Sequence, residues 1–209
     1  MRREEMVAYL ECGPLDKVDL CQCETATKRL FCARAVNSKA LNMEFVRQVS
    51  RMLHEEHMAA LLLLERLESA LHRTGRSELP DMADNDFLRL MGDLKAGIEA
   101  EISNHFAFEE KELFPCLRKA GDGGMVDLLC EEHKAILPLG HRLAELAHSV
   151  RSGSLTIDDW GTFHRLGGEF VERLRSHIDK EEIGLISSVE GTIDEEEDMH
   201  LAEQYAYSR

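Results

Sequence analysis

Four long segments of this chain place apolar residues at the spacing of an α-helix, and no segment of useful length alternates as a β-strand does. The segments cover residues 43–73, 84–119, 125–151 and 157–189, and short Gly-, Pro- or Ser-containing stretches separate them. Thr156 is followed three residues later by Asp159, a spacing typical of a capping box at a helix start. Amphipathic helices joined by short loops fold most simply as an up-down-up-down four-helix bundle. We therefore expect an all-α protein of this architecture.

The two ends of the chain differ from the middle in composition. Residues 1–42 are mixed and hold four of the six cysteines, whereas residues 191–209 begin with an acidic run. We expect a bundle over residues 43–190, a cysteine-containing N-terminal extension and an acidic C-terminal tail, both accessory to the bundle. Tyr205 and Tyr207 could pack back on the bundle from this otherwise solvated tail.

Charge and hydropathy exclude several classes of function. The chain has 25 Lys+Arg and 40 Asp+Glu, a net charge of −15, which repels phosphate backbones and anionic lipid. It has no apolar run of 18 residues, and its first residues lack the apolar centre of a signal peptide. We expect a cytoplasmic protein that binds neither nucleic acid nor membrane.

Each predicted helix carries a histidine inside its apolar stripe. These are His57, His105, His133 and His177, and two of them are followed four residues later by a carboxylate, Glu109 or Glu181. Four residues rotate by only about 40° and rise about 6 Å, so the two side chains of H-x-x-x-E share one face of a helix. For each pair of neighbouring helices, the distances from their histidines to the loop that joins them differ by six residues or fewer, which is about 9 Å. All six side chains can therefore lie in one layer.

A buried, ionised glutamate is costly unless positive charge lies beside it. The stripes contain no inward Lys or Arg. Two divalent cations would balance Glu109 and Glu181 and leave room for a bridging oxygen species and a further ligand. Imidazole with bridging carboxylate suits iron or manganese, and zinc can substitute.

Two other metal patterns fail on spacing. Ferritin-like sites need Glu-x-x-His, but the residues three before the four histidines are His54, Ile102, Cys130 and Leu174. The segment His54-Glu55-Glu56-His57 is not the H-E-x-x-H of zinc proteases. His54 remains a candidate for a supporting contact or a spare ligand, as does Glu182, although a step of five residues turns Glu182 about 140° from His177 and favours Glu181. Glu110 is expected to be solvated or to support a ligand.

The sequence resembles the hemerythrin-like family, the HHE cation-binding domain. The stretches that carry the resemblance are Leu53-His54-Glu55-Glu56-His57, His105-Phe106-Ala107-Phe108-Glu109-Glu110-Lys111-Glu112-Leu113-Phe114-Pro115, Glu131-Glu132-His133 and His177-Ile178-Asp179-Lys180-Glu181-Glu182. The resemblance implies a non-haem di-iron centre in a four-helix bundle, with both glutamates bridging the metals. Phe106, Phe108, Phe114 and Phe170 are expected to pack around it.

Departures from the oxygen carriers of that family shape the expected function. The carriers have H-x-x-x-H on the third helix and H-x-x-x-x-D on the fourth, whereas here Leu137 stands at the position of the second histidine and the carboxylate comes four residues after His177. Five-histidine coordination is lost unless His54 or His141 reaches the site. The pattern is more similar to the branch of sensors, nitric oxide responders and iron-centre repair proteins.

We therefore expect a di-iron protein that binds O2, NO or peroxide as a sensor, scavenger or redox-responsive protein. The alternatives are a di-iron redox or repair enzyme and an iron-dependent regulatory module, and we favour binding over catalysis. A redox or protein partner is compatible with each. Cys12, Cys21, Cys23 and Cys32 match no common zinc or iron–sulfur spacing, so free thiols are favoured over a metal or redox role. The family's repair proteins have an adjacent Cys-Cys pair that is absent here.

Overall fold

The computed structural model describes residues 45–207, apart from the side chains at positions 100 and 101. Every regular element in this range is helical, which confirms the predicted fold class. The elements are α2 (Gln48–Arg73), α3 (Asn85–Ala96), η4 (Gly97–Ile102), α4 (Ser103–Phe108), η5 (Glu109–Leu113), α5 (Phe114–Ala120), α6 (Gly123–Arg151), α7 (Ile157–Lys180), η6 (Glu181–Leu185), α8 (Ile186–Thr192) and α9 (Glu195–Tyr207). The N-terminal cysteines and the expected extension over residues 1–42 lie outside the described residues.

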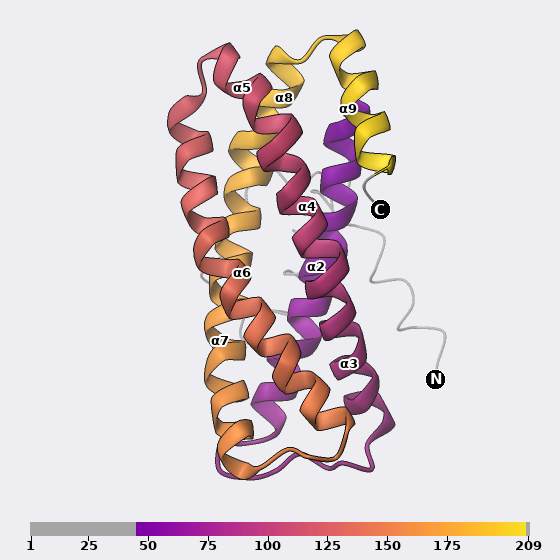
Figure 1. Ribbon diagram of the computed structural model, residues 1–209, viewed down its shortest axis with the longest axis vertical. Coiled ribbons are helices and arrows are strands. Elements are labelled where there is room, and N and C mark those ends of the chain that lie inside the picture. Colours follow the sequence, from indigo (N-terminus) through magenta and orange to yellow (C-terminus); the bar gives the residue numbers. More distant parts are fainter. Residues whose placement is uncertain (1–44, 208–209) are drawn as a thin grey trace, which may run out of the picture. The chain divides into compact units, whose positions relative to one another are not determined.

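Four helical columns form the bundle (Figure 1). The second column is continuous from α3 to α5, and the fourth runs from α7 through η6 into α8. The α2 helix packs against α3 and α7, and α6 packs against the same two helices from the opposite corner. Three segments are π-helical: η4 and η5 in the second column and η6 in the fourth. These two columns are locally wider there.

Local sequence explains where several of these helices begin or end. Asp84 accepts hydrogen bonds from the backbone N–H groups of Asp86 and Phe87 at the start of α3. The predicted capping box is present at α7, where Thr156 and Asp159 satisfy each other's backbone N–H groups. Gly121 ends α5 with φ at 110°, a left-handed conformation that favours glycine. The third helix begins at Gly123, two residues before the expected start.

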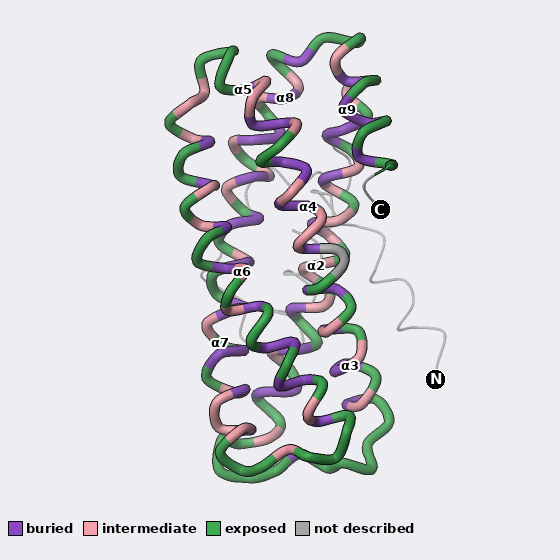
Figure 2. Tube along the Cα trace, viewed as in Figure 1, coloured by how far each residue is buried: buried purple, intermediate pink, exposed green. Residues whose placement is uncertain are grey.

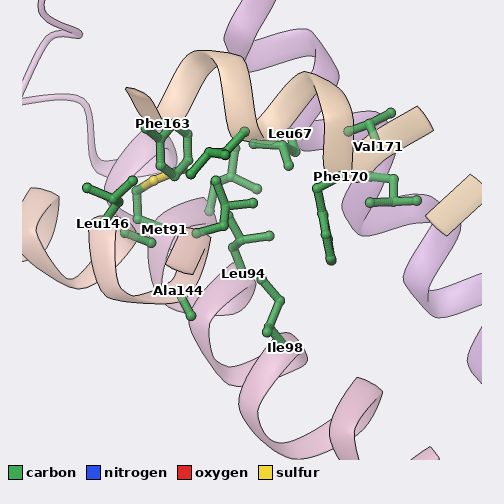
Figure 3. Close-up of a cluster of buried hydrophobic side chains, with 14 of the residues drawn as sticks. Leu67, Met91, Leu94, Ile98, Ala144, Leu146, Phe163, Phe170 and Val171 are labelled. Atoms are coloured by element: carbon green, nitrogen blue, oxygen red, sulfur yellow. The ribbon is translucent and has the colours of Figure 1, made fainter. Parts of the chain in front are cut away.

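Two clusters of buried apolar side chains fill the bundle, one toward each end. The first is shown in Figure 3, where Leu67 of α2 lies with Met91 and Leu94 of α3, and with Phe163 and Phe170 of α7. The second lies around α5, α8 and α9. Buried positions alternate with exposed ones along every helix (Figure 2), as expected for amphipathic helices.

The layer between these clusters is polar. Along α2, Leu53 belongs to one cluster and Leu64 to the other, and the buried His57 lies between them. The same order is found along α6, where His133 lies between Leu129 and Ile136. The two apolar clusters thus enclose a polar layer and separate it from both ends of the bundle.

The acidic C-terminal segment forms a further helix, α9, which packs against α2 outside the four columns (Figure 1). Leu201, Ala202 and Tyr205 are buried against the bundle, whereas Tyr207 is 86% exposed. Of the two tyrosines that could pack back, only Tyr205 does so. The buried carboxylate of Asp198 accepts hydrogen bonds from the backbone N–H groups of Gln48 and Val49, at 2.8 and 2.9 Å.

None of the helices in residues 45–207 is both long and apolar enough to cross a lipid bilayer.

Candidate metal centre

Six buried side chains meet in the polar layer, and we call them the His/Glu cluster. They are His57 from α2, His105 from α4, Glu109 from η5, His133 from α6, His177 from α7 and Glu181 from η6. All six were predicted from the sequence, and the structure brings all six together. Glu109 and Glu181 are completely buried.

The cluster divides into two sets of four ligand atoms that share both glutamates. His57 and His105 form one set with Glu109 and Glu181, and His133 and His177 form the other, each set having its atoms within 4.8 Å of one another. Each glutamate directs one oxygen to each histidine pair. Each set of four could hold one cation, and both glutamates would then contribute to both sets.

The distances support this division of the oxygens. Glu181 Oε2 lies 3.1 Å from His57 Nε2, and its Oε1 lies 2.9 Å from His177 Nε2. Glu109 Oε1 lies 3.3 Å from His105 Nε2, and its Oε2 lies 3.4 Å from His133 Nε2. Within each histidine pair the two Nε2 atoms are 3.3 and 3.1 Å apart.

Four further carboxylates fix the orientation of the imidazole rings. The Nδ1 atom of His57 donates to Glu182, that of His105 to Glu56, that of His133 to Glu110 and that of His177 to Glu132, over 2.5 to 3.0 Å. A carboxylate can only accept, so the Nδ1 atom carries the proton in each ring. In a neutral ring Nε2 is then an acceptor, as a metal ligand must be.

These supporting contacts run once around the bundle. Each glutamate comes from one column and holds the histidine of the next, in chain order from α2 to α7 and back to α2. Glu182 and Glu110 were expected to be supporting or solvated groups, and they occupy supporting positions. Glu56 and Glu132 were missed, although each directly precedes a cluster histidine and, like Glu110 and Glu182, stands next to a cluster residue.

The centre of the cluster contains acceptors without donors. The four carboxylate oxygens of Glu109 and Glu181 have no hydrogen-bond partner among the described residues. Four Nε2 atoms face the same space, and their rings already donate from Nδ1. Buried acceptors that face one another are costly, so the donor set fits cations placed between them.

The same demand for positive charge changes the pKa values of the rings. Burial opposes the charged form of His133, but Glu109 and Glu181 outweigh it and raise its pKa from 6.5 to about 9. For His57 and His105 burial is likewise outweighed, and the pKa of His105 is raised well above its ordinary value. Burial also opposes ionisation of Glu181, but the neighbouring rings hold its pKa well below the usual range. The rings of His57, His105 and His133 therefore hold a proton more tightly than a free imidazole does.

The sequence left open whether Glu181 or Glu182 joins the cluster and whether His54 or His141 reaches it. Glu181 lies in the cluster, whereas Glu182 lies outside it and accepts from His57 and, at 2.8 Å, from His54. His54 therefore contacts the cluster only through Glu182. His141 contacts Ser103, and neither His54 nor His141 adds a fifth histidine.

Aromatic rings pack around the cluster on one side. Phe106 stacks on His133 with ring centroids 3.7 Å apart, and Phe114 lies near the same ring at 5.7 Å. Phe108 contacts Tyr205, whose hydroxyl is 3.2 Å from His105 Nδ1. Phe170 lies seven residues before His177 on α7, within the first apolar cluster.

Comparison with known protein families agrees with this geometry. The family model of the hemerythrin HHE cation binding domain matches residues 48–187. This range contains the whole cluster and all four supporting glutamates. No curated protein matches the chain. The matched range covers more than half of the sequence and includes every bundle column. The helical columns, the two buried carboxylates shared by the histidine pairs and this match together place the chain in the hemerythrin HHE cation-binding domain family.

Proposed function

We propose that the His/Glu cluster holds two iron ions and that the protein binds O2, NO or peroxide there, as a sensor, scavenger or redox-responsive protein. Manganese and zinc are plausible substitutes, since both accept imidazole and carboxylate ligands. A cytoplasmic location remains the prediction of the composition.

One observation carries this proposal. Each of the two fully buried glutamates directs one oxygen to one histidine pair and its other oxygen to the other pair. No donor among the described residues satisfies these oxygens. A single cation would serve one histidine pair and leave the other facing unpaired oxygens. Two cations satisfy both pairs at once, and four imidazoles with two carboxylates suit iron.

Bound iron would supply a redox-active centre for small ligands, and this chain's residues define its surroundings. The supporting glutamates hold the imidazole rings in one tautomer and orientation. Phe106 and Phe114 exclude water from the side of His133. The Tyr205 hydroxyl lies beside His105 and provides a polar group at the edge of the cluster.

The test of the metal centre is metal content measured on purified protein. We expect two metal ions per chain in the wild type and a loss of at least one in His105→Ala and Glu109→Ala. His141→Ala is the matched control, because His141 contacts Ser103 outside the cluster. Unchanged metal content in both cluster variants would refute the assignment.

The ligand is tested by the visible spectrum of the anaerobically reduced protein before and after exposure to air. A band that appears with O2 and disappears on its removal supports reversible binding. Irreversible oxidation favours the alternative of a di-iron redox or iron-centre repair enzyme, which turnover with an electron donor would then establish.

The contact between α9 and the cluster favours a second candidate, an iron-dependent regulatory module. Tyr205 links the C-terminal helix to His105, so a change at the cluster can alter the docking of α9. Limited proteolysis tests this candidate. We expect faster cleavage near Asp194, which precedes α9, in the metal-free protein than in the loaded one, and equal rates would exclude it.

A further inference from the structure

A cavity of about 510 Å³ adjoins one side of the His/Glu cluster. Its walls come from α2, η4, α4, α7, η6 and α9, and it contacts His57, His105, His177 and Glu181. Glu109 and His133 do not line it. The cavity therefore lies beside the cluster, on the side away from α6.

The cavity is much larger than the small ligands of the proposed function require. Along α2 it extends from Met52 to Leu63, which corresponds to about 16 Å at 1.5 Å per residue. A diatomic molecule occupies about the same space as one water, roughly 30 Å³. Pockets for organic ligands typically have volumes of about 300–1,000 Å³. The size of this cavity is that of an organic ligand site.

The side chains of the walls are mainly apolar away from the cluster. The residues that form this part are Ala60, Leu63, Ile102, Phe106, Leu174 and Ile178. Among the described residues, the charged side chains that line the cavity, besides the histidines, are Glu55, Glu56 and Glu181, and none is Lys or Arg. The six carboxylates of the cluster and its supporting contacts outnumber the four positive charges that four protonated imidazoles or two divalent cations would supply, so an anion meets net negative charge. A neutral apolar molecule instead gains from leaving water.

The cavity also has a route to solvent. Glu55 and Ala59 line it and are exposed on α2, so the cavity reaches solvent along this part of α2. The small side chain of Ala60, one turn from His57, leaves the space open between the entrance and the cluster. A larger residue at position 60 would fill this space.

We propose that this cavity binds a neutral, apolar organic molecule, of the size of a substituted benzene ring or a short alkyl chain, directly beside the His/Glu cluster. This goes beyond the binding of a diatomic ligand or peroxide. The binding itself does not depend on the metal centre, and only the distance from bound metal to the organic molecule rests on the proposed function.

The test compares two fluorinated probes of matched size by ¹⁹F NMR, neutral fluorobenzene and anionic 4-fluorobenzoate. We expect fluorobenzene to bind the wild type saturably and 4-fluorobenzoate to bind at least tenfold more weakly. Ala60→Phe should weaken fluorobenzene binding at least tenfold. Ala135→Phe is the matched control, because Ala135 is exposed on α6 and does not line the cavity. Ala60→Leu, a smaller change, should give an intermediate loss if Ala60→Phe does not fold.

Position is read from a second measurement on protein loaded with cobalt or with zinc. Bound fluorobenzene should show a broader ¹⁹F line with paramagnetic cobalt than with zinc, because the cavity adjoins the cluster. Absence of saturable binding, equal binding of the two probes, or unchanged binding in the folded position-60 variants would overturn the proposed binding site. Equal line widths would overturn its position beside the metals. Failure to load metal would count against the metal centre alone, since binding is measured without it.

Discussion

The Nδ1–H donors of the four cluster histidines all reach carboxylates, and this determines what the Nε2 atoms can do. Each ring is held by a glutamate from a neighbouring column, so the rings cannot rotate independently of the bundle. The negative charge next to Nδ1 also makes Nε2 a stronger donor of electrons to a cation. We therefore expect the supporting glutamates to raise the affinity of the cluster for cations, although their own carboxylates lie outside it.

Glu132→Gln tests this effect at one ring. The amide oxygen can still accept from His177 Nδ1, but the charge is lost, so we expect metal affinity to fall roughly 10- to 100-fold. Competition with a chelating dye would measure it. Glu131→Gln is the control, because Glu131 is an exposed neighbour that contacts only Lys134 among the described residues. Equal affinities of the two variants would contradict the expected role of Glu132.

Proton release provides a second prediction at this scale. Below a pKa of about 9, the metal-free His133 ring carries an additional proton, and metal must displace it. Apparent metal affinity should therefore rise as pH increases from about 6.5 toward 9, and fewer protons should be released per metal at the higher pH. Calorimetric titrations in buffers of different ionisation enthalpy would count the protons. An affinity that falls over this range would contradict the prediction.

Residue spacing predicted the six cluster members but not the contacts that support them. The choice of Glu181 over Glu182 followed from helix rotation, a local property that the chain alone determines. Glu56 and Glu132 could not be assigned in this way, because each reaches across to a histidine on another column. Such contacts depend on how closely and at what height the helices pack, which no single helix specifies.

At the scale of elements, each cluster glutamate opens a π-helical turn. The N–H of Phe114 bonds to the carbonyl of Glu109 five residues earlier, and that of Ile186 bonds to the carbonyl of Glu181. The extra residue shifts the buried face, so Phe114 and Leu117 are buried whereas Cys116 is only half-buried. A stripe drawn with a constant period of 3.6 residues could not anticipate this shift.

The N-terminus of α2 depends on an element remote in sequence. Arg47 provides no side-chain cap. Asp198 of α9 accepts the first two backbone N–H groups of the helix instead, and Glu190 of α8 accepts those of the two residues before it. The negative charge of Asp198 also favours this position at the positive end of the helix dipole. The acidic tail was expected to be mainly solvated, and its capping role was not visible because the two segments are about 150 residues apart.

Asp198→Ala should therefore destabilise the bundle by about 1–2 kcal/mol, the usual cost of losing a helix cap. Urea unfolding followed by circular dichroism would measure the change. Glu196→Ala, at an exposed position on the same helix, should have little effect. A loss in Asp198→Ala no larger than in this control would show that α9 does not stabilise the start of α2.

At the scale of the whole bundle, the His/Glu cluster lies between two separate apolar clusters that are built on the same helical columns. Metal that binds the folded cluster and not the unfolded chain stabilises the fold by about 4 kcal/mol when free metal exceeds its Kd a thousandfold. For a chain of this size, each kcal/mol raises Tm by about 2–4 °C, so loading should raise Tm by roughly 8–16 °C. Glu109→Gln, with one bridging charge removed, should show a much smaller rise.

The pH dependence of the folding stability distinguishes protein stabilised by bound metal from protein stabilised by protons on the cluster. The raised pKa of His133 means that its proton stabilises the metal-free fold fully below its ordinary value of 6.5, and this stabilisation is lost as pH rises through about 9. Bound metal replaces that proton, so the loaded protein should lose less stability over the same range. Calorimetric melting of both forms between pH 6.5 and 9 measures the difference. Parallel decreases in Tm would indicate that the cluster's charge is not what holds the two halves of the bundle together.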